Sequence, residues 1–143
     1  MTASNQAIDE VVTENPQQIV EAFLDACSEL DFDKAVAYID DNCIYKNVPF
    51  HTAKGKNRIR RDLGSMSGAM NLFHVEMVHI AVNGNVVLTE RVDTLGGRFF
   101  KAAIPLMGVF VVNNGKITEW RDYFDWSSGL GKTIGSVFTS WRR

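Results

Sequence analysis

Residues 83–126 decide the fold, and they read NGNVVLTERVDTLGGRFFKAAIPLMGVFVVNNGKITEWRDYFDW. Apolar and polar residues alternate along much of this stretch, which is typical of strands with one covered and one open face. Asn83-Gly84 and Asn114-Gly115 have the residue types of tight hairpin turns, and Gly96-Gly97 provides a further turn between them. The stretch therefore predicts antiparallel strands that follow one another along the chain, at 70–81, 85–95, 98–112 and 116–126.

Helical patterns precede these strands. Asn15-Pro16 and Gln18 have the residue types of a helix start with a capping box, and apolar residues continue at helical spacing to Leu30. A second short helix is expected from Asp31 to Ile39. Further elements are expected as a short strand at 43–49, a polar loop from His51 and a third helix at about 56–66.

The order of these elements predicts an α+β fold, with helices packed on one curved sheet. No internal repeat or linker divides the chain, so residues 1–143 are expected to form a single domain. Residues 1–14 are expected to be a flexible lead-in, and residues 127–143 a C-terminal tail or helix.

The composition excludes several classes of protein. The chain has 143 residues, of which 45% are hydrophobic and 22% charged, and its net charge is -2. A near-neutral chain lacks the basic surface of a nucleic-acid binder. No apolar run approaches the ~18 residues of a membrane span, and the N-terminus lacks the pattern of a signal peptide. Cys27 and Cys43 make no disulfide framework and favour a reducing cytoplasm. No residues have the spacing of metal ligands, so no metal is expected.

Two predicted strands carry charges where a core is expected. Strand alternation puts Trp120, Asp122 and Phe124 on one face, so Asp122 lies between two large aromatic side chains. A carboxylate there is costly unless it is paired, hydrogen-bonded or protonated. Arg91 and Asp93 share a face of the strand 85–95. Both faces of that strand mix apolar and charged residues, so the period leaves open whether Arg91 and Asp93 are buried or form an exposed ion pair.

A curved sheet can bring these side chains together with Tyr45 and Asn47, which are in phase on the strand 43–49. Arginine can bridge two carboxylates with its planar group of donors. Burial would raise the pKa of one carboxyl, while Arg91 would hold the other ionised. Two carboxyls in different protonation states form an acid and a base. The residues thus indicate acid–base chemistry on a largely apolar small molecule.

At these residues the sequence resembles the limonene-1,2-epoxide hydrolases, which belong to the nuclear-transport-factor-2-like (NTF2-like, SnoaL-like) superfamily of cone-shaped α+β domains. The resemblance lies in Tyr45-Lys46-Asn47, in Thr89-Glu90-Arg91-Val92-Asp93 and in GKITEWRDYFD at 115–125. It runs from about Val20 to Trp126. It implies a cone-like domain whose strongly curved sheet is mixed but mostly antiparallel.

The resemblance also implies a reaction, a one-step hydrolysis of an epoxide that needs no cofactor. Asp122 would be the general base on a water held by Tyr45 and Asn47. Asp93 would be the general acid, and Arg91 would link the two carboxyls. A homodimer is expected as well, and the substrate is expected to be a terpene-, steroid- or lipid-like epoxide.

Substrate-binding positions carried over from the family are all apolar, and each could equally be ordinary core: Leu24, Met66, Met70, Leu72, Val75, Leu95, Leu106 and Phe124. The sequence departs from the family in a shorter segment from Gly96 to Lys101 and in Pro105, which indicates a bulge or an edge position. These departures concern the shape of the pocket rather than the reaction.

Two other functions fit parts of the pattern. An isomerase or dehydratase of the same fold would use one Asp to move a proton beside a carbonyl of a hydrophobic ketone. It would not need a water clamp or an arginine between two carboxyls. A non-catalytic small-molecule binding module would tolerate Asn at positions 93 and 122.

Overall fold

The computed structural model describes residues 15–48 and 50–125. Within them lie the helices α1 (Pro16–Ser28), α2 (Phe32–Val36) and α3 (Lys56–Ser67). The strands are β1 (Ile39–Val48), β2 (His51–Lys54), β3 (Leu72–Asn83), β4 (Val86–Gly96), β5 (Lys101–Asn113) and β6 (Lys116–Phe124). The predictions for the lead-in over 1–14 and for the tail over 127–143 fall outside the described residues.

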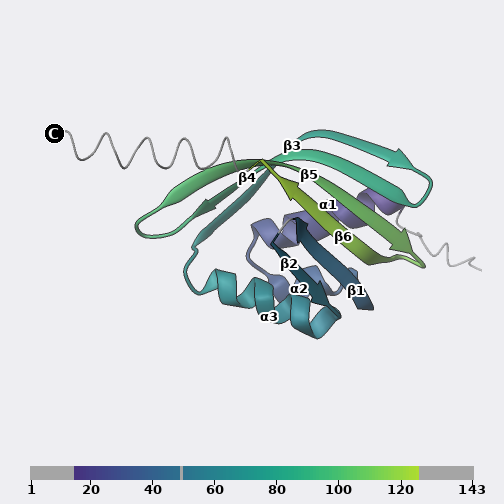
Figure 1. The fold of residues 1–143 in the computed structure, drawn as a ribbon, viewed down its shortest axis with the longest axis horizontal. Coiled ribbons are helices and arrows are strands. Elements are labelled where there is room, and N and C mark those ends of the chain that lie inside the picture. The colour runs from purple at the N-terminus through teal and green to yellow at the C-terminus, as the bar shows by residue number, and fades with distance from the viewer. Residues whose placement is uncertain (1–14, 49, 126–143) are drawn as a thin grey trace, which may run out of the picture.

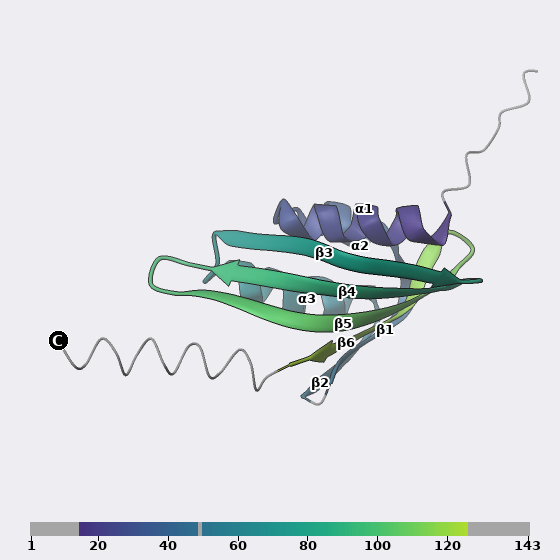
Figure 2. The same ribbon diagram turned by 90° about the horizontal axis from the view of Figure 1, so that it is seen from above.

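All the described strands form one sheet in the order β2-β1-β6-β5-β4-β3. Strands β3 to β6 pair antiparallel with their neighbours, whereas β1 pairs parallel with β6. The sheet curves around the helices (Figures 1 and 2). The predicted α+β fold, with helices on a curved, mostly antiparallel sheet, is therefore confirmed.

The first helix begins as its sequence indicates. The Asn15 side chain accepts a hydrogen bond from the Gln18 backbone N–H, at 2.9 Å. The Gln18 side chain in turn accepts one from the Asn15 backbone N–H, at 3.0 Å. This capping box satisfies two N–H groups that the helix would otherwise leave unpaired. It fixes the start of α1, whose apolar side packs into the core.

Two segments differ from the predictions. Ile39 was expected in the second helix but begins β1, because α2 ends at Val36 and the Tyr38 carbonyl already bonds the Ile117 N–H of β6, at 2.8 Å. Residues 51–54 were expected as a loop but form β2, antiparallel to β1. Only Ala53 of β2 is buried, so its local sequence carries too little alternation to indicate a strand.

Pro105 lies within β5, opposite Val92 of β4 and without a shift of register. The expected bulge at Pro105 is therefore wrong. The expected edge position is wrong as well, because β5 lies between β4 and β6, and the Asp125 N–H donates to the Pro105 carbonyl at 3.1 Å. Pro105 thus takes part in the sheet through its carbonyl, although its nitrogen has no hydrogen to donate.

The core lies between the helices and the inner face of the sheet. Phe23 of α1 contacts the Trp120 ring edge-on, with ring centroids 5.0 Å apart, and the Phe110 ring at 6.1 Å. Ile59 of α3 and Ile117 of β6 are fully buried. This packing places Trp120 and the residues that follow it against the interior of the domain.

Candidate active site

The parallel pairing of β1 with β6 assembles one half of the site. Tyr45 is opposite Trp120 in register, and Asn47 is opposite Asp122. The rings of Tyr45 and Trp120 stack, with centroids 3.9 Å apart. Strands β1 and β6 lie more than 60 residues apart in the sequence. Tertiary structure alone therefore brings the Tyr45 and Asn47 pair beside Asp122.

The other half comes from β4, where the structure decides the face that the sequence left open. Val87, Thr89, Arg91 and Asp93 are buried, whereas Leu88 and Glu90 are exposed. Arg91 and Asp93 thus belong to the inner face, and the alternative of an exposed ion pair is wrong.

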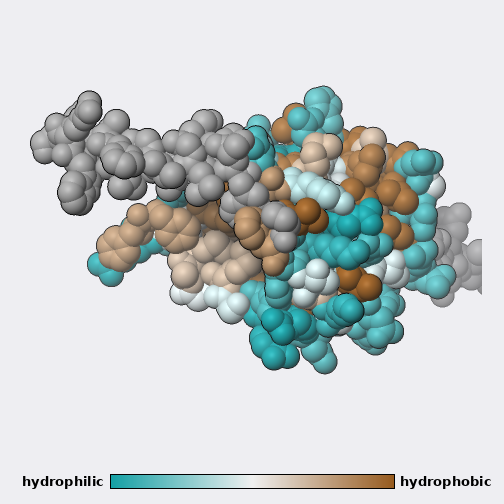
Figure 3. Space-filling model, in the orientation of Figure 1, coloured by the Kyte–Doolittle hydropathy of each residue, from teal (hydrophilic) through white to brown (hydrophobic). Residues whose placement is uncertain are grey.

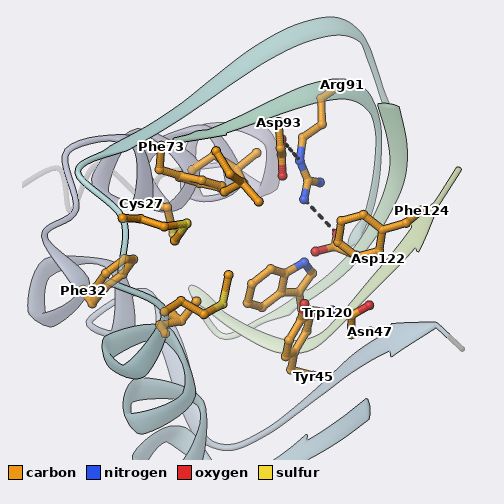
Figure 4. Close-up of a pocket in the computed structure, with 15 residues that line it drawn as sticks. Cys27, Phe32, Tyr45, Asn47, Phe73, Arg91, Asp93, Trp120, Asp122 and Phe124 are labelled. Atoms are coloured by element: carbon orange, nitrogen blue, oxygen red, sulfur yellow. Dashed lines mark hydrogen bonds and ion pairs between the residues drawn. The ribbon is translucent and has the colours of Figure 1, made fainter. Parts of the chain in front are cut away.

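Arg91 joins the two halves of the site (Figure 4). Its Nε donates to Asp93 Oδ1 at 3.0 Å, and its Nη2 donates to Asp122 Oδ1 at 2.8 Å. Its Nη1 donates to Thr89 Oγ1 at 3.0 Å. The side chain of Arg91 is only 1% exposed. Such buried, charge-assisted hydrogen bonds fix the relative position of the two carboxyls.

The surroundings act on the two carboxyls in different ways. Burial raises the pKa of Asp93 to about 6, against the lowering effect of Arg91. Burial also raises the pKa of Asp122, but there the nearby Trp120 N–H and Tyr45 O–H act together with Arg91 to lower it. More donors therefore favour the ionised form of Asp122 than that of Asp93. The two groups titrate as a coupled pair.

Arg91 stays charged in this setting. Burial by itself would lower the pKa of Arg91, but Asp122 and Asp93 outweigh burial and raise it. Tyr45 keeps its proton, because burial raises the pKa of its hydroxyl. The site therefore contains a permanent cation, a neutral phenol donor and two carboxyls.

Two buried polar atoms beside Asp122 are short of partners. Asn47 Oδ1 has no hydrogen-bond partner among the described residues. The Trp120 N–H lies near Asp122 and lowers its pKa, yet it falls short of a well-formed hydrogen bond. Buried polar groups in native proteins are nearly always paired. An acceptor and a donor left open at one place can bind a small polar molecule.

The raised pKa of Asp93 predicts a dependence of stability on pH. A carboxyl whose pKa is raised on folding stabilises the fold while it is protonated, and that contribution is lost as the pH rises through about 6. Asp93→Asn copies the neutral form. We expect this variant to gain about 1–3 kcal/mol in unfolding free energy over wild type at pH 7.5, and little at pH 4. Urea unfolding of both proteins at the two pH values measures the difference in unfolding free energy. An equal difference at pH 4 and at pH 7.5 would contradict the prediction.

An apolar pocket opens beside these polar groups (Figure 4). Of the predicted substrate-binding residues, Leu24, Met66, Met70, Leu95 and Phe124 line it, together with all of Tyr45, Asn47, Arg91, Asp93 and Asp122. Met66 is 46% exposed, so it lies toward the mouth. An unbranched thioether can adapt its shape to a ligand.

The other predicted substrate-binding residues, Leu72, Val75 and Leu106, are not in the lining of this pocket. Leu72 is 37% exposed on the outer face of β3. Val75 packs against the core, and Leu106 is buried in register with Arg91. The predicted pair of Leu72 and Val75 conflicts with strand alternation, because residues three apart point to opposite faces.

Several lining residues were missed in the sequence: Cys27, Phe32, Leu63, Phe73 and Trp120. Alternation from Val75 indicates Phe73 rather than Leu72, so that signal was available. The others come from α1, α2, α3 and β6, and only the packing of the helices on the sheet brings them together. Burial raises the pKa of the Cys27 thiol to about 12, which makes it an apolar wall rather than a nucleophile.

Residues 15–48 and 50–125 contain no group of three or more His, Cys, Asp or Glu side chains arranged to hold a metal ion. In the same part of the chain no helix is both long and apolar enough to cross a membrane.

Two buried carboxyls beside an apolar pocket are suited to acid–base catalysis. The fold and the site thus define this chain as a small α+β domain with an acid–base site. The model of the limonene-1,2-epoxide hydrolase catalytic domain matches residues 14–134. The epoxide hydrolase EphG of Mycobacterium tuberculosis (strain ATCC 25618 / H37Rv) is 42% identical over 106 residues, which are 74% of this chain and 70% of EphG. The chain belongs to the limonene-1,2-epoxide hydrolase family, and it is an epoxide hydrolase of that family.

Solved structures agree with this assignment. An epoxide hydrolase of M. tuberculosis, described as like those of this family, superposes with a TM-score of 0.75 at 36% identity and covers 87% of this chain and 96% of its own. A putative SnoaL-like polyketide cyclase from Shewanella putrefaciens CN-32 has a TM-score of 0.76 at 17% identity, with 85% and 96% covered. The second likeness shows only that the fold is shared.

Proposed function

We propose that the protein adds water in one step to a largely apolar epoxide, of terpene, steroid or lipid type, and releases a vicinal diol. One observation carries the proposal: a buried arginine links two buried carboxyls at the wall of an apolar pocket, with hydrogen bonds of 3.0 Å and 2.8 Å. Membership of the epoxide hydrolase family gives the bond that these groups act on.

Asp122 is the general base in this proposal. A water molecule bound beside it would donate one proton to the Asp122 carboxylate and the other to Asn47 Oδ1, the buried acceptor that has no partner in the described residues. Tyr45, opposite Trp120 and two residues before Asn47, would turn its O–H from Asp122 to the water. Holding the water in place removes much of the entropic cost of bringing it to the epoxide carbon.

Asp93 is the general acid. Burial raises its pKa to about 6, so the protonated form that can donate to the epoxide oxygen persists to higher pH than in an ordinary carboxyl. As the water oxygen bonds to one epoxide carbon, the C–O bond to that carbon breaks and the epoxide oxygen takes the Asp93 proton. The water proton ends on Asp122. After release of the diol, exchange with solvent restores an ionised Asp122 and a protonated Asp93.

Arg91 keeps the two carboxyls in complementary states. With the guanidinium between them, one ionised and one protonated carboxyl give an overall neutral cluster, which suits a buried site. Two ionised carboxyls would leave a net negative charge there, and two protonated ones a net positive charge. The arrangement therefore favours one acid and one base at the same time.

The pocket supports an apolar substrate. Away from Tyr45, Asn47, Arg91, Asp93 and Asp122, its lining is made of Leu, Phe, Met, Cys and Trp side chains. Such a surface gains from removing hydrocarbon from water but gives few directional contacts. We infer that the bulk of the substrate lies against Met66 and Met70 and that its epoxide lies against the carboxyls.

Hydrolysis in ¹⁸O-labelled water tests the proposal. The purified protein is incubated with limonene oxide, a steroid epoxide and a fatty-acid epoxide, and the diols are analysed by mass spectrometry. We expect ¹⁸O in the diol from the first turnover, because water attacks the epoxide directly. Unlabelled diol in a single-turnover experiment would indicate a covalent enzyme intermediate and would overturn the one-step mechanism. Tight binding of all three epoxides without any diol would favour an isomerase or a binding module.

We also propose that the enzyme is a homodimer. The outer face of the sheet exposes large apolar side chains: Leu88 is 43% exposed, Met107 49% and Tyr123 43%. Met107 and Tyr123 are opposite each other in the pairing of β5 with β6. Figure 3 shows the surface from the side of Figure 1, where hydrophobic residues lie among polar ones. Light scattering after size exclusion would return the monomer mass if this proposal is wrong.

A reducing cytoplasm remains the proposed location. Cys27 and Cys43 are both free and buried, and free thiols are typical of proteins in reducing compartments. Fractionation of the source cells would test this location.

A further inference from the structure

Three residues on neighbouring strands form a row across the inner face of the sheet. Thr89 of β4 is opposite Gly108 of β5, and Gly108 is opposite Asp122 of β6. Arg91 belongs to the next row, opposite Leu106. Its side chain must therefore cross from its own row to reach Asp122, two strands away.

Gly108 leaves the space for this crossing. A Cβ atom at position 108 would collide with Nη1 of Arg91 and would lie 2.6 Å from Thr89 Oγ1. Neither neighbour can withdraw easily, because Arg91 is 1% exposed and bonded on both sides, and Thr89 is 1% exposed. The absence of a side chain at this one position allows the guanidinium to lie over β5.

Thr89 holds the end of the guanidinium that the carboxyls do not reach. Its Oγ1 accepts from Nη1 at 3.0 Å, while Nε and Nη2 are taken by Asp93 and Asp122. The Phe110 ring lies below, with its centroid 5.8 Å from Arg91 Cζ. Each of the three guanidinium nitrogens of Arg91 thus has a hydrogen-bond partner, and these bonds oppose rotation of the group.

We propose that Thr89 and Gly108 are positioning residues for the reaction, and that they hold Arg91 in the one orientation that bridges the acid and the base. This inference rests on the proposed function for its effect on catalysis. A hydroxyl suits the role because it accepts a hydrogen bond without adding charge. A third carboxylate at position 89 would compete with Asp93 and Asp122 for the same cation.

Matched variants at position 89 test the role of the acceptor. Thr89→Val keeps the shape of the side chain and removes the oxygen, whereas Thr89→Ser keeps the oxygen. We expect kcat/KM for limonene oxide or a fatty-acid epoxide to fall about ten- to a hundredfold in Thr89→Val, the range for loss of a hydrogen bond to a charged group. Thr89→Ser should stay within about threefold of wild type. Thr94→Val, on the opposite face of β4, is the control.

The pH profile separates positioning from a purely structural role. Arg91 lowers the pKa of both Asp93 and Asp122, so a displaced guanidinium lets both pKa values rise. In the profile of kcat/KM against pH, activity rises on the acidic limb as Asp122 becomes ionised, and it falls on the alkaline limb as Asp93 loses its proton. Both limbs of kcat/KM should therefore move to higher pH in Thr89→Val and stay in place in Thr89→Ser. A lower rate with unmoved limbs would overturn the proposal.

A measurement without substrate keeps the two proposals apart. In ¹⁵N spectra of the guanidinium groups, wild type and Thr89→Ser should show separate Nη signals for Arg91, and Thr89→Val averaged ones. If the wild-type protein makes no diol from any epoxide, the proposed function fails. The ¹⁵N spectra then still test whether Thr89 holds the guanidinium of Arg91 in one orientation. If Thr89→Val does not fold, Thr89→Ala replaces it in these measurements. For position 108, a folded Gly108→Ala with full activity would refute the role of Gly108.

Discussion

Asp122→Asn is expected to lower kcat for diol formation about a thousandfold. The amide has no lone pair basic enough to take a proton from water, so the nucleophile loses its activation. The side chain keeps the size of the carboxylate, and its oxygen can still accept from Arg91 Nη2, which donates to Asp122 at 2.8 Å in the wild type. Binding of an apolar product or substrate analogue should therefore change much less than kcat.

A carboxylate outside the site supplies the control for this variant. Asp25 is exposed on α1, and Asp25→Asn should leave kcat within about twofold of wild type. Circular dichroism and urea unfolding establish that both variants are folded. A folded Asp122→Asn with wild-type kcat would mean that another group takes the proton from water, and the assigned mechanism would be wrong.

Arg91→Met is expected to remove activity and to destabilise the fold, in a manner that depends on pH. Breaking one side of a buried ion pair costs about 3–5 kcal/mol, and here two carboxyls lose their shared partner. Arg91 lowers the pKa of both carboxyls in the wild type, so its loss raises both pKa values further. Between the unfolded and the folded pKa values, Asp93 and Asp122 of Arg91→Met are therefore protonated in the folded protein and ionised in the unfolded chain.

The sign of the pH effect follows from these raised pKa values. The stabilising contribution of the protons is complete below the unfolded pKa of about 4 and is lost as the pH rises through the folded values. The deficit of Arg91→Met against wild type should thus be larger at pH 8 than at pH 5. Urea unfolding at both pH values measures it, with Arg58→Met of the exposed Arg58–Asp62 pair as the control.

Arg91→Lys separates the charge from the geometry. A lysine keeps the cation but lacks the planar set of donors that reaches Asp93, Asp122 and Thr89 at once. We expect this variant to recover part of the lost stability and little of the activity. Equal recovery of both would show that Arg91 acts through its charge alone.

Much of the architecture could be predicted from local patterns. The turns at Asn83-Gly84 and Asn114-Gly115 form where predicted, with positive φ angles at Gly84, Asn114 and Gly115. Hairpin register is set by the turn, so the order of β3 to β6 follows directly from the sequence. The capping box at Asn15 is equally local, because its partners lie three residues apart.

The site required more than local patterns. The parallel pairing that puts Asn47 opposite Asp122 joins distant segments, and no period in either strand encodes it. The short strand β2 has one buried residue and is stabilised by its partner rather than by its own pattern. Thr89 belongs to a segment that carries the family resemblance, but neither its role nor that of Gly108 could be predicted, because both depend on where the guanidinium of Arg91 lies.

The sequence by itself determined which side chains share a face: Arg91 with Asp93, and Asp122 with Trp120, because alternation along a strand is a property of the backbone. Only the tertiary structure decided that these faces are inside and that they face each other. Burial is set by the helices and by the pairing of β1 with β6. The raised pKa values follow from that burial, so the chemistry of the site exists only in the folded chain.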